Sequence, residues 1–138
     1  YNEALKWFRK AADQGDDDSQ KMLGYMFYYG EGVDQDYKEA AKWYSLAAEQ
    51  DNKDAQSVLG YLYYKGLGVG QDYSEAANWY SKAARQEEPS SQFNLGYMYY
   101  SGLGVPEDEV KARYWFNKAC DNDFQDACDI IEKMDDNN

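Results

Sequence analysis

Apolar side chains recur along the chain at the spacing of one helix face, in two separate sets within every 36 residues. Within residues 17–52 the two sets are Met22, Leu23, Met26 and Phe27, and then Ala40, Ala41, Trp43, Tyr44, Ala47 and Ala48. Both sets follow the i, i+3, i+4, i+7 rule that places side chains on one face of an α-helix. Between them, the segment Gly30-Glu31-Gly32-Val33 contains glycines that can end a helix in the left-handed region. The pattern therefore predicts two helices separated by a turn.

Residue types repeat with the same period. The four tryptophans follow one another at intervals of 36 residues, and nine of the 11 glycines keep that period too. The periodic positions include Trp7, Trp43, Trp79 and Trp115, then Gly24, Gly60 and Gly96, then Gly30, Gly66 and Gly102, and then Gly32, Gly68 and Gly104. A period in this range is typical of a solenoid, in which each unit covers the apolar face of its neighbour.

The repeat predicts an all-α fold, an α/α solenoid with the form of a right-handed superhelix, built from 36-residue helix-turn-helix units. We expect first helices at about 17–30, 53–66, 89–102 and 125–135, and second helices at about 1–14, 36–50, 72–86 and 107–121. The chain is predicted to form one domain, with a half-unit at 1–16, repeats at 17–52, 53–88 and 89–124, and a capping half-unit at 125–138. Tyr1 corresponds to Tyr37 inside a second helix, so we expect the chain to be a processed or excised piece.

Acidic residues mark the start of each second helix. The D-x-x-E pattern at 36–39 and again at 72–75 resembles a capping box, in which the aspartate accepts hydrogen bonds from free helix amides. The third unit has Asp108 followed by Lys111, so we expect a weaker cap there, with Pro106 presetting the first turn.

Composition excludes several classes of function. The chain has 26 acidic and 14 basic residues, a formal net charge of −12, and no histidine. Nucleic-acid binding needs clustered Lys and Arg, so this charge balance argues against it. The lack of histidine excludes His-dependent catalysis and His-ligated metal sites. Mean hydropathy is −0.94 and no apolar run approaches the roughly 18 residues of a membrane span, so we expect no membrane insertion. We expect no catalytic residues, no metal and no cofactor.

One stretch of the chain resembles a Sel1-like repeat (SLR), a relative of the tetratricopeptide repeat with a longer loop between its helices. This stretch is residues 55–84, AQSVLGYLYYKGLGVGQDYSEAANWYSKAA, which carries A-x-x-x-L-G-x-x-Y-x-x-G-x-G-V, then D-x-x-x-A, W-Y and K-A-A. The resemblance covers nearly the whole chain and implies an interaction scaffold. The last half-unit departs from it, because Ile130, Ile131 and Glu132 replace the x-Leu-Gly element, and we interpret this half-unit as a terminal cap.

Tyrosine recurs on the face of each first helix that points away from the apolar set. First helices line the concave wall of tetratricopeptide-like solenoids, so the resemblance implies a groove with a ladder of tyrosines. Tyrosine combines a rigid ring with a hydroxyl group at a low entropy cost, which suits peptide binding. The candidate partner-binding residues are Tyr25, Tyr28, Tyr61, Tyr64, Tyr97, Tyr100, Lys21 and Phe93. The alternative is that these rings pack between adjacent helices and complete the core.

The two cysteines, Cys120 and Cys128, flank the turn between the last two predicted helices. Antiparallel helices with a short turn can bring these positions together, so a disulfide is geometrically feasible. The even number of cysteines and their spacing favour this bond, and two free thiols in a reducing cytosol are the alternative. The C-x7-C spacing resembles that of the Helicobacter cysteine-rich proteins. That resemblance, together with the cysteine pair, favours a periplasmic or secreted location, whereas reduced cysteines would indicate a cytoplasmic one.

These observations favour a non-catalytic scaffold that binds a protein or peptide segment in the concave groove. Its acidity favours a partner with basic residues and speeds their association at low salt. We expect a monomer that binds no nucleic acid. Two alternatives stay open: penicillin binding or weak β-lactamase activity, as the cysteine-rich branch implies, and a structural segment of a longer repeat protein.

Overall fold

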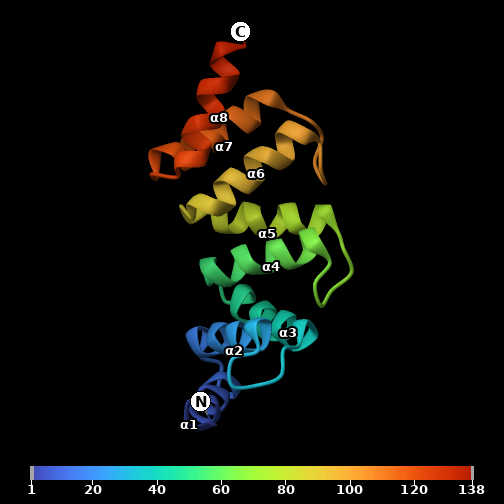
Figure 1. Ribbon diagram of the computed structural model, residues 1–138, viewed down its shortest axis with the longest axis vertical. Coiled ribbons are helices and arrows are strands. Elements are labelled where there is room, and N and C mark those ends of the chain that lie inside the picture. Colours follow the sequence, from blue (N-terminus) through green and yellow to red (C-terminus); the bar gives the residue numbers. More distant parts are fainter. Residues whose placement is uncertain (1, 138) are drawn as a thin grey trace.

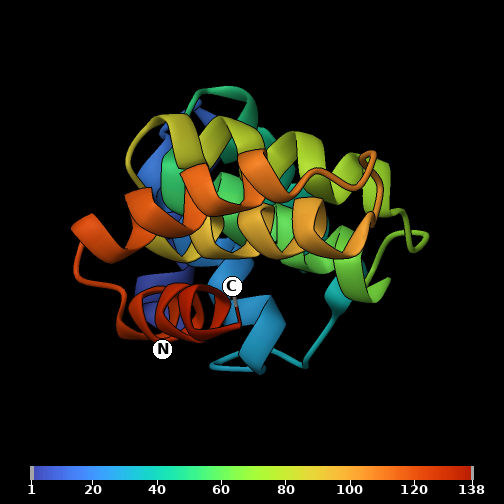
Figure 2. The same cartoon turned by 90° about the horizontal axis from the view of Figure 1, so that it is seen from above.

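The computed structural model describes the backbone of residues 2–137 and the side chains of residues 3–137, and Tyr1 lies outside the described residues. In this part of the chain every regular element is an α-helix, so the predicted α/α solenoid is confirmed. The helices stack from α1 at one end to α8 at the other, with the termini at opposite ends (Figure 1). Figure 2 looks down the stack and shows helices of successive units crossing at different angles. The helices are α1 Asn2–Asp13, α2 Asp17–Tyr29, α3 Tyr37–Glu49, α4 Lys53–Lys65, α5 Tyr73–Arg85, α6 Pro89–Ser101, α7 Glu109–Asp121 and α8 Gln125–Asp136.

Glycines end the first helix of each complete unit, as the sequence predicts. The caps Gly30, Gly66 and Gly102 have φ values of 71°, 74° and 68°, in the left-handed region. In each case the N–H of the cap donates to the carbonyl four residues earlier, which satisfies a free helix carbonyl. A residue with a Cβ atom adopts this conformation only with strain, so glycine defines where the loop begins.

Each complete second helix begins after an aspartate N-cap. Asp108 accepts a hydrogen bond from the backbone N–H of Lys111 at 3.0 Å, as the aspartate before α5 does from the third residue after it, whereas the aspartate before α3 accepts two such bonds. The third cap therefore has one fewer hydrogen bond than the first and as many as the second. The N–H of Asp108 itself donates to the carbonyl of Tyr99 in the preceding helix (2.9 Å), so no glutamate is needed to satisfy it. Pro106 lies two residues before the cap, outside the first turn of α7.

The two helices of a unit approach closely because a glycine in the first helix leaves room for a ring of the second. A Cβ atom at Gly60 would lie 2.8 Å from Cδ1 of Tyr80, closer than real Cβ contacts. The three such pairs are Gly24–Tyr44, Gly60–Tyr80 and Gly96–Phe116. All three rings are buried, so the contact adds apolar burial and dispersion energy on both sides.

The loop between the two helices of a unit stacks on the preceding unit. In unit 53–88 the loop passes over the start of α3, where a Cβ atom at Gly68 would overlap the backbone carbonyl of Tyr37. Gly104 lies in the same way against the carbonyl of Tyr73. Because side chains are missing at these two positions, the backbones of neighbouring units can meet directly.

A buried glutamine near the start of each complete unit links three helices. Gln56 donates from Nε2 to the carbonyl of Ala48 in the preceding unit (3.1 Å), and its Oε1 accepts from Nε2 of Gln86 after α5 (2.9 Å). Both ends of the buried amide are therefore paired, as burial requires. Gln20 and Gln92 make equivalent pairs of hydrogen bonds, so a ladder of amides runs along the solenoid.

A disulfide replaces the glutamine contact in the last unit. Cys128 stands in the register of Gln92 and Cys120 in the register of Ala84, and the two sulfur atoms are bonded, so the favoured pairing is confirmed. The first turn of α8 has no side-chain cap. The covalent bond and an ion pair between Arg113 and Asp135 (2.7 Å) hold α8 against α7 instead.

We predict that Gly68→Ala lowers the free energy of unfolding by at least about 2 kcal/mol, because it adds a clash with the Tyr37 carbonyl and a strained φ of 75°. Gly70→Ala in the same loop is the matched control, since its Cβ would meet nothing within 4 Å. Urea unfolding followed by circular dichroism measures both variants. Equal stabilities for the two would contradict the stacking described here.

We also predict an order of stability for variants of the last unit. Replacing both cysteines by alanine should cost about 2.5 kcal/mol in the chain-entropy view of a short disulfide loop. Combining Cys120→Ala with Cys128→Gln should recover about 1 kcal/mol of this loss, because a glutamine side chain at position 128 can donate to the carbonyl of residue 120 as its counterparts do. Unfolding of the oxidised protein and both variants measures the order. If the variant with Cys128→Gln were no more stable than the double alanine, the prediction would be refuted.

Candidate functional site

A hollow of about 450 Å³ lies between the first helices α2, α4 and α6. It is lined by Tyr25, Tyr28, Tyr29, Tyr44, Ser57, Val58, Tyr61, Tyr80, Ser90 and Asn94. A smaller hollow of about 150 Å³ is lined by Tyr61, Tyr80 and Asn94 as well, together with Tyr64 and Tyr97. Because the two hollows share three residues, we treat them as one surface and name it the tyrosine groove.

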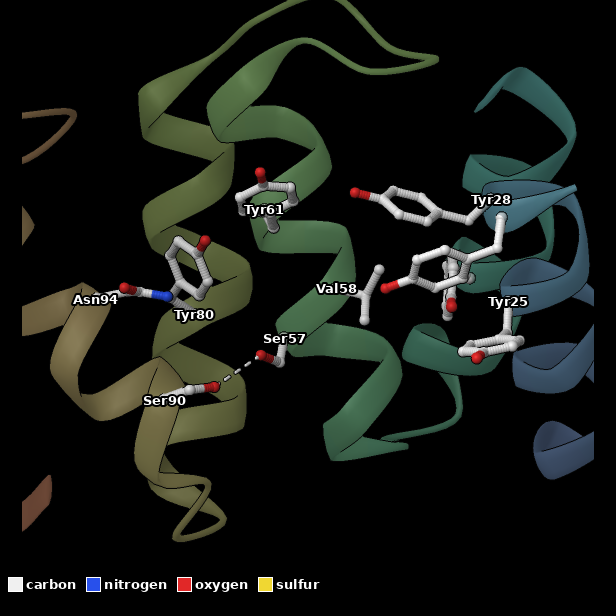
Figure 3. Close-up of a pocket in the computed structure, with 10 residues that line it drawn as sticks. Tyr25, Tyr28, Ser57, Val58, Tyr61, Tyr80, Ser90 and Asn94 are labelled. Atoms are coloured by element: carbon white, nitrogen blue, oxygen red, sulfur yellow. Dashed lines mark hydrogen bonds between the residues drawn. The ribbon is translucent and has the colours of Figure 1, made fainter. Parts of the chain in front are cut away.

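Tyrosines of successive first helices form the walls of the groove. In Figure 3 the ring of Tyr28 of α2 points toward Tyr61 of α4, and Tyr25 of α2 lines the same hollow. Tyr25, Tyr61 and Tyr97 occupy the same register in three units and are 40%, 40% and 42% exposed. Large aromatic surface is therefore open to solvent at the same place in each unit.

The other two wall tyrosines are held by rings of the second helices. The ring of Tyr28 lies 5.3 Å from that of Tyr37, and the ring of Tyr64 lies 5.2 Å from that of Tyr73, both edge to face. Such pairs are worth about 1 kcal/mol beyond simple burial. Tyr28 and Tyr64 are thus half-buried and fixed in orientation.

The floor of the groove comes from the second helices. Tyr44 and Tyr80 lie against Gly24 and Gly60, and both line the hollow. Helical spacing assigns Tyr44 to the apolar face and so misses this role. One feature of the sequence could have indicated it. Two units carry a tyrosine hydroxyl at this buried position, whereas the third unit has Phe116, which has no hydroxyl.

Small polar groups complete the site beside the rings. The hydroxyl groups of Ser57 and Ser90 are 3.4 Å apart, so they link α4 to α6 (Figure 3). The side chain of Asn94 lies beside the ring of Tyr80 (Figure 3), and both residues line the two hollows. Asn94 corresponds to Val58 in the preceding unit, so the repeat pattern does not predict a polar side chain at this position.

The residues that line the tyrosine groove are all uncharged. Burial first, and then the neighbouring Tyr64 and Tyr61, raise the pKa of Tyr80 above its ordinary value of 10. Burial raises the pKa of Tyr28 and Tyr44 in the same direction. These phenols therefore stay protonated at neutral pH, and each offers both a donor and an acceptor.

Three of the residues selected from the sequence lie outside the two hollows. Lys21 forms ion pairs with Asp54 (3.4 Å) and Asp18 (4.0 Å). Phe93 packs on the rings of Phe116 and Phe124, at centroid distances of 5.6 and 5.2 Å. Tyr100 is 47% exposed on α6. The structure therefore gathers five of the six selected tyrosines into the tyrosine groove and leaves Tyr100, Lys21 and Phe93 beside it.

No helix among the described residues has the length and apolar character needed to cross a membrane. Across residues 2–137, the structure also brings together no group of three or more Cys, Asp or Glu side chains suited to hold a metal ion.

Comparison with solved structures finds close matches in fold. A protective antigen of uropathogenic Escherichia coli that displays an SLR fold matches with a TM-score of 0.87 and 41% identity over 89% of this chain, which spans only 26% of that antigen. A Sel1 repeat protein from Oxalobacter formigenes matches with a TM-score of 0.86 and 34% identity, covering 94% of this chain and 97% of the other. Helicobacter pylori cysteine rich protein B matches with a TM-score of 0.71 and 28% identity, covering 91% and 96%.

Family comparison agrees with the spacing of the repeats. No curated protein matches the sequence. The Sel1 repeat matches at residues 1–16, 17–52, 53–87 and 89–124, which together make up most of the chain. Sel1 repeats commonly serve as protein-interaction scaffolds. From the repeat matches, the stacked helices and the solved relatives together, the chain belongs to the Sel1 repeat family.

Proposed function

We propose that this protein is a non-catalytic scaffold that binds an extended peptide segment of a partner protein in the tyrosine groove. The observation that carries the proposal is the neutral hollow of about 450 Å³, which is lined by rings and hydroxyl groups from five successive helices. A hollow that continues from unit to unit suits a linear ligand better than a compact one.

The chemistry of the lining fits a polypeptide backbone. The protonated hydroxyls of Tyr28, Tyr44 and Tyr80 can pair with backbone N–H and C=O groups, while the rings cover apolar side chains. Asn94 adds an amide with the same dual capacity. Neutral donors and acceptors are desolvated at a lower cost than charged ones, so the groove can exclude water when a peptide binds.

The net charge of −12 favours partners with basic residues. Because the groove lining is neutral, this charge acts at a distance, by raising the rate of encounter rather than by direct pairing. Lys21, close to Asp18 and Asp54, and Tyr100 at the end of α6 extend the proposed surface. Phe93 packs against other rings, so we assign it to support of α6.

The disulfide supports a periplasmic or secreted location, since such bonds persist in oxidising compartments. We propose that the protein works there as a monomer. A second candidate role is that of one segment in a longer repeat array, which the 26% coverage of the E. coli antigen favours.

We predict that replacing Tyr61, Tyr64 and Tyr97 by serine weakens peptide binding by more than about 30-fold, the loss expected of interface hot spots. The probe is a peptide selected on the immobilised protein from a random phage library and then measured by fluorescence polarisation. The melting temperature should change by only a few degrees, because Tyr61 and Tyr97 are exposed.

Tyr114→Ser is the control for this triple variant, because Tyr114 is 53% exposed on α7 and lies outside the groove. It should leave peptide affinity unchanged. Undiminished affinity of the triple variant would refute the groove as the binding site, and a collapse of its melting temperature would assign these rings to the core.

A second variant tests the floor hydroxyl alone. Tyr80→Phe should weaken peptide binding about five- to tenfold, the loss of one hydrogen bond, without lowering the free energy of unfolding. The fold tolerates this change because Phe116 makes the same contact with Gly96 in the next unit. The same polarisation assay and a urea titration measure the two quantities. Unchanged affinity would remove Tyr80 from the proposed site.

A further inference from the structure

A further hollow lies at the junction between the units 17–52 and 53–88. It measures about 340 Å³ and shares no residue with the tyrosine groove. We name it the junction hollow, and its lining residues are Asp51, Gln56, Lys82, Arg85 and Gln86. Both cations lie in the last turn of α5, and the ammonium group of Lys82 is 4.5 Å from the centroid of the Trp79 ring. Two cations therefore share one hollow in a chain whose net charge is −12.

The next junction along the solenoid shows what such a place can hold. Residues in the registers of Asp51, Lys82 and Gln56 are Glu87, Lys118 and Gln92. The carboxylate oxygen Oε2 of Glu87 lies 3.7 Å from Nζ of Lys118 and accepts a hydrogen bond from Nε2 of Gln92 at 3.3 Å. A glutamate carboxylate thus joins the lysine to the buried glutamine.

Asp51 makes neither of these contacts, although its backbone matches that of Glu87. The two residues have φ values of 66° and 63°, and each follows a glutamine with a φ of −92°. The difference is that aspartate is shorter by one methylene group. Across residues 3–137, no ion pair involves Asp51, Lys82 or Arg85. Both cations of the junction hollow therefore lack a carboxylate partner within the described chain.

The buried amide of Gln56 has one donor to spare. Gln56 is 1% exposed and lines the junction hollow. Its Nε2 donates to the carbonyl of Ala48 and makes no other hydrogen bond among the described residues, whereas Nε2 of Gln92 donates both to a backbone carbonyl and to Glu87. An amide nitrogen carries two N–H groups, so one N–H of Gln56 lacks a protein acceptor. A buried donor of this kind favours the binding of an acceptor.

The pair of cations occurs at this junction alone. The residues that correspond to Lys82 and Arg85 are Leu46 and Glu49 in the unit before, and Lys118 and Asp121 in the unit after. Packing between units therefore does not require two cations at these positions.

We propose that the junction hollow binds the carboxylate of a glutamate side chain from a partner protein. This carboxylate takes the position that Glu87 takes one unit later, so it accepts from the second N–H of Gln56 and lies beside Lys82, with Arg85 as a further cation. The net charge of −12 repels acidic ligands at long range, so binding rests on these short contacts. Because the tyrosine groove is a separate surface, either proposal can fail without the other.

Peptide titrations followed by NMR test the proposal. The probe is acetyl-Gly-Glu-Gly-amide, and the readout is the side-chain amide signal of Gln56 in the isotope-labelled protein. The signal should shift and saturate with a dissociation constant on the order of 1 mM, the strength of a single charge-assisted contact. Acetyl-Gly-Gln-Gly-amide should cause no saturable shift. Acetate and inorganic phosphate should bind several-fold more weakly, and equal or tighter binding of either would overturn the assignment to a glutamate side chain.

Asp51→Glu is the most direct variant, because its longer side chain should occupy the junction hollow as Glu87 does. It should weaken the probe at least about tenfold without disturbing the fold, since Glu87 has the same backbone conformation. Arg85→Gln should weaken the probe several-fold. Lys65→Gln removes the same charge at the other end of α4 and should leave its affinity unchanged. Undiminished affinity of Asp51→Glu, or equal shifts with the glutamate and glutamine peptides, would refute the proposal.

Discussion

The contact between a glycine of the first helix and a ring of the second sets the geometry of every complete unit. Because glycine has no Cβ atom, the ring of Tyr80 lies against the α4 backbone at Gly60 rather than against a side chain. The helices then come close enough to bury Ala76 and Ala83 completely. The same approach leaves Tyr80 at the floor of the tyrosine groove, so one contact serves both the fold and the candidate site.

The candidate site depends on residues that differ between units as much as on those that repeat. The ring against glycine is a tyrosine in two units and Phe116 in the third, and Phe116 lines neither hollow. Val58 and Asn94 occupy equivalent positions in two units, and both line the groove. Val58 contributes an apolar side chain there and Asn94 a polar one. Repeated residues build the scaffold, because packing is the same in each unit, while the unique residues give each stretch of the groove its own chemistry.

The ladder of buried glutamines explains how a stack of small units keeps its register. An unpaired buried amide is costly, so each glutamine is stable only where both neighbouring helices supply partners. In the last unit a disulfide makes the equivalent link between Cys120 and Cys128 without a partner from a further unit.

The helices, their ends and their order can be predicted from the amino-acid sequence alone, because they follow from local spacing, from glycine at the loops and from aspartate at the caps. Five of the wall tyrosines also follow from the sequence, since a 36-residue period places them in equivalent positions, and the cysteine pair follows from its place on either side of the last turn. The positions of Tyr44 and Tyr80 at the groove, and of Phe93 against other rings, emerge from the packing of neighbouring helices. Helical periodicity assigns a residue to a face of its own helix, but what that face meets depends on neighbouring helices that the pattern does not place.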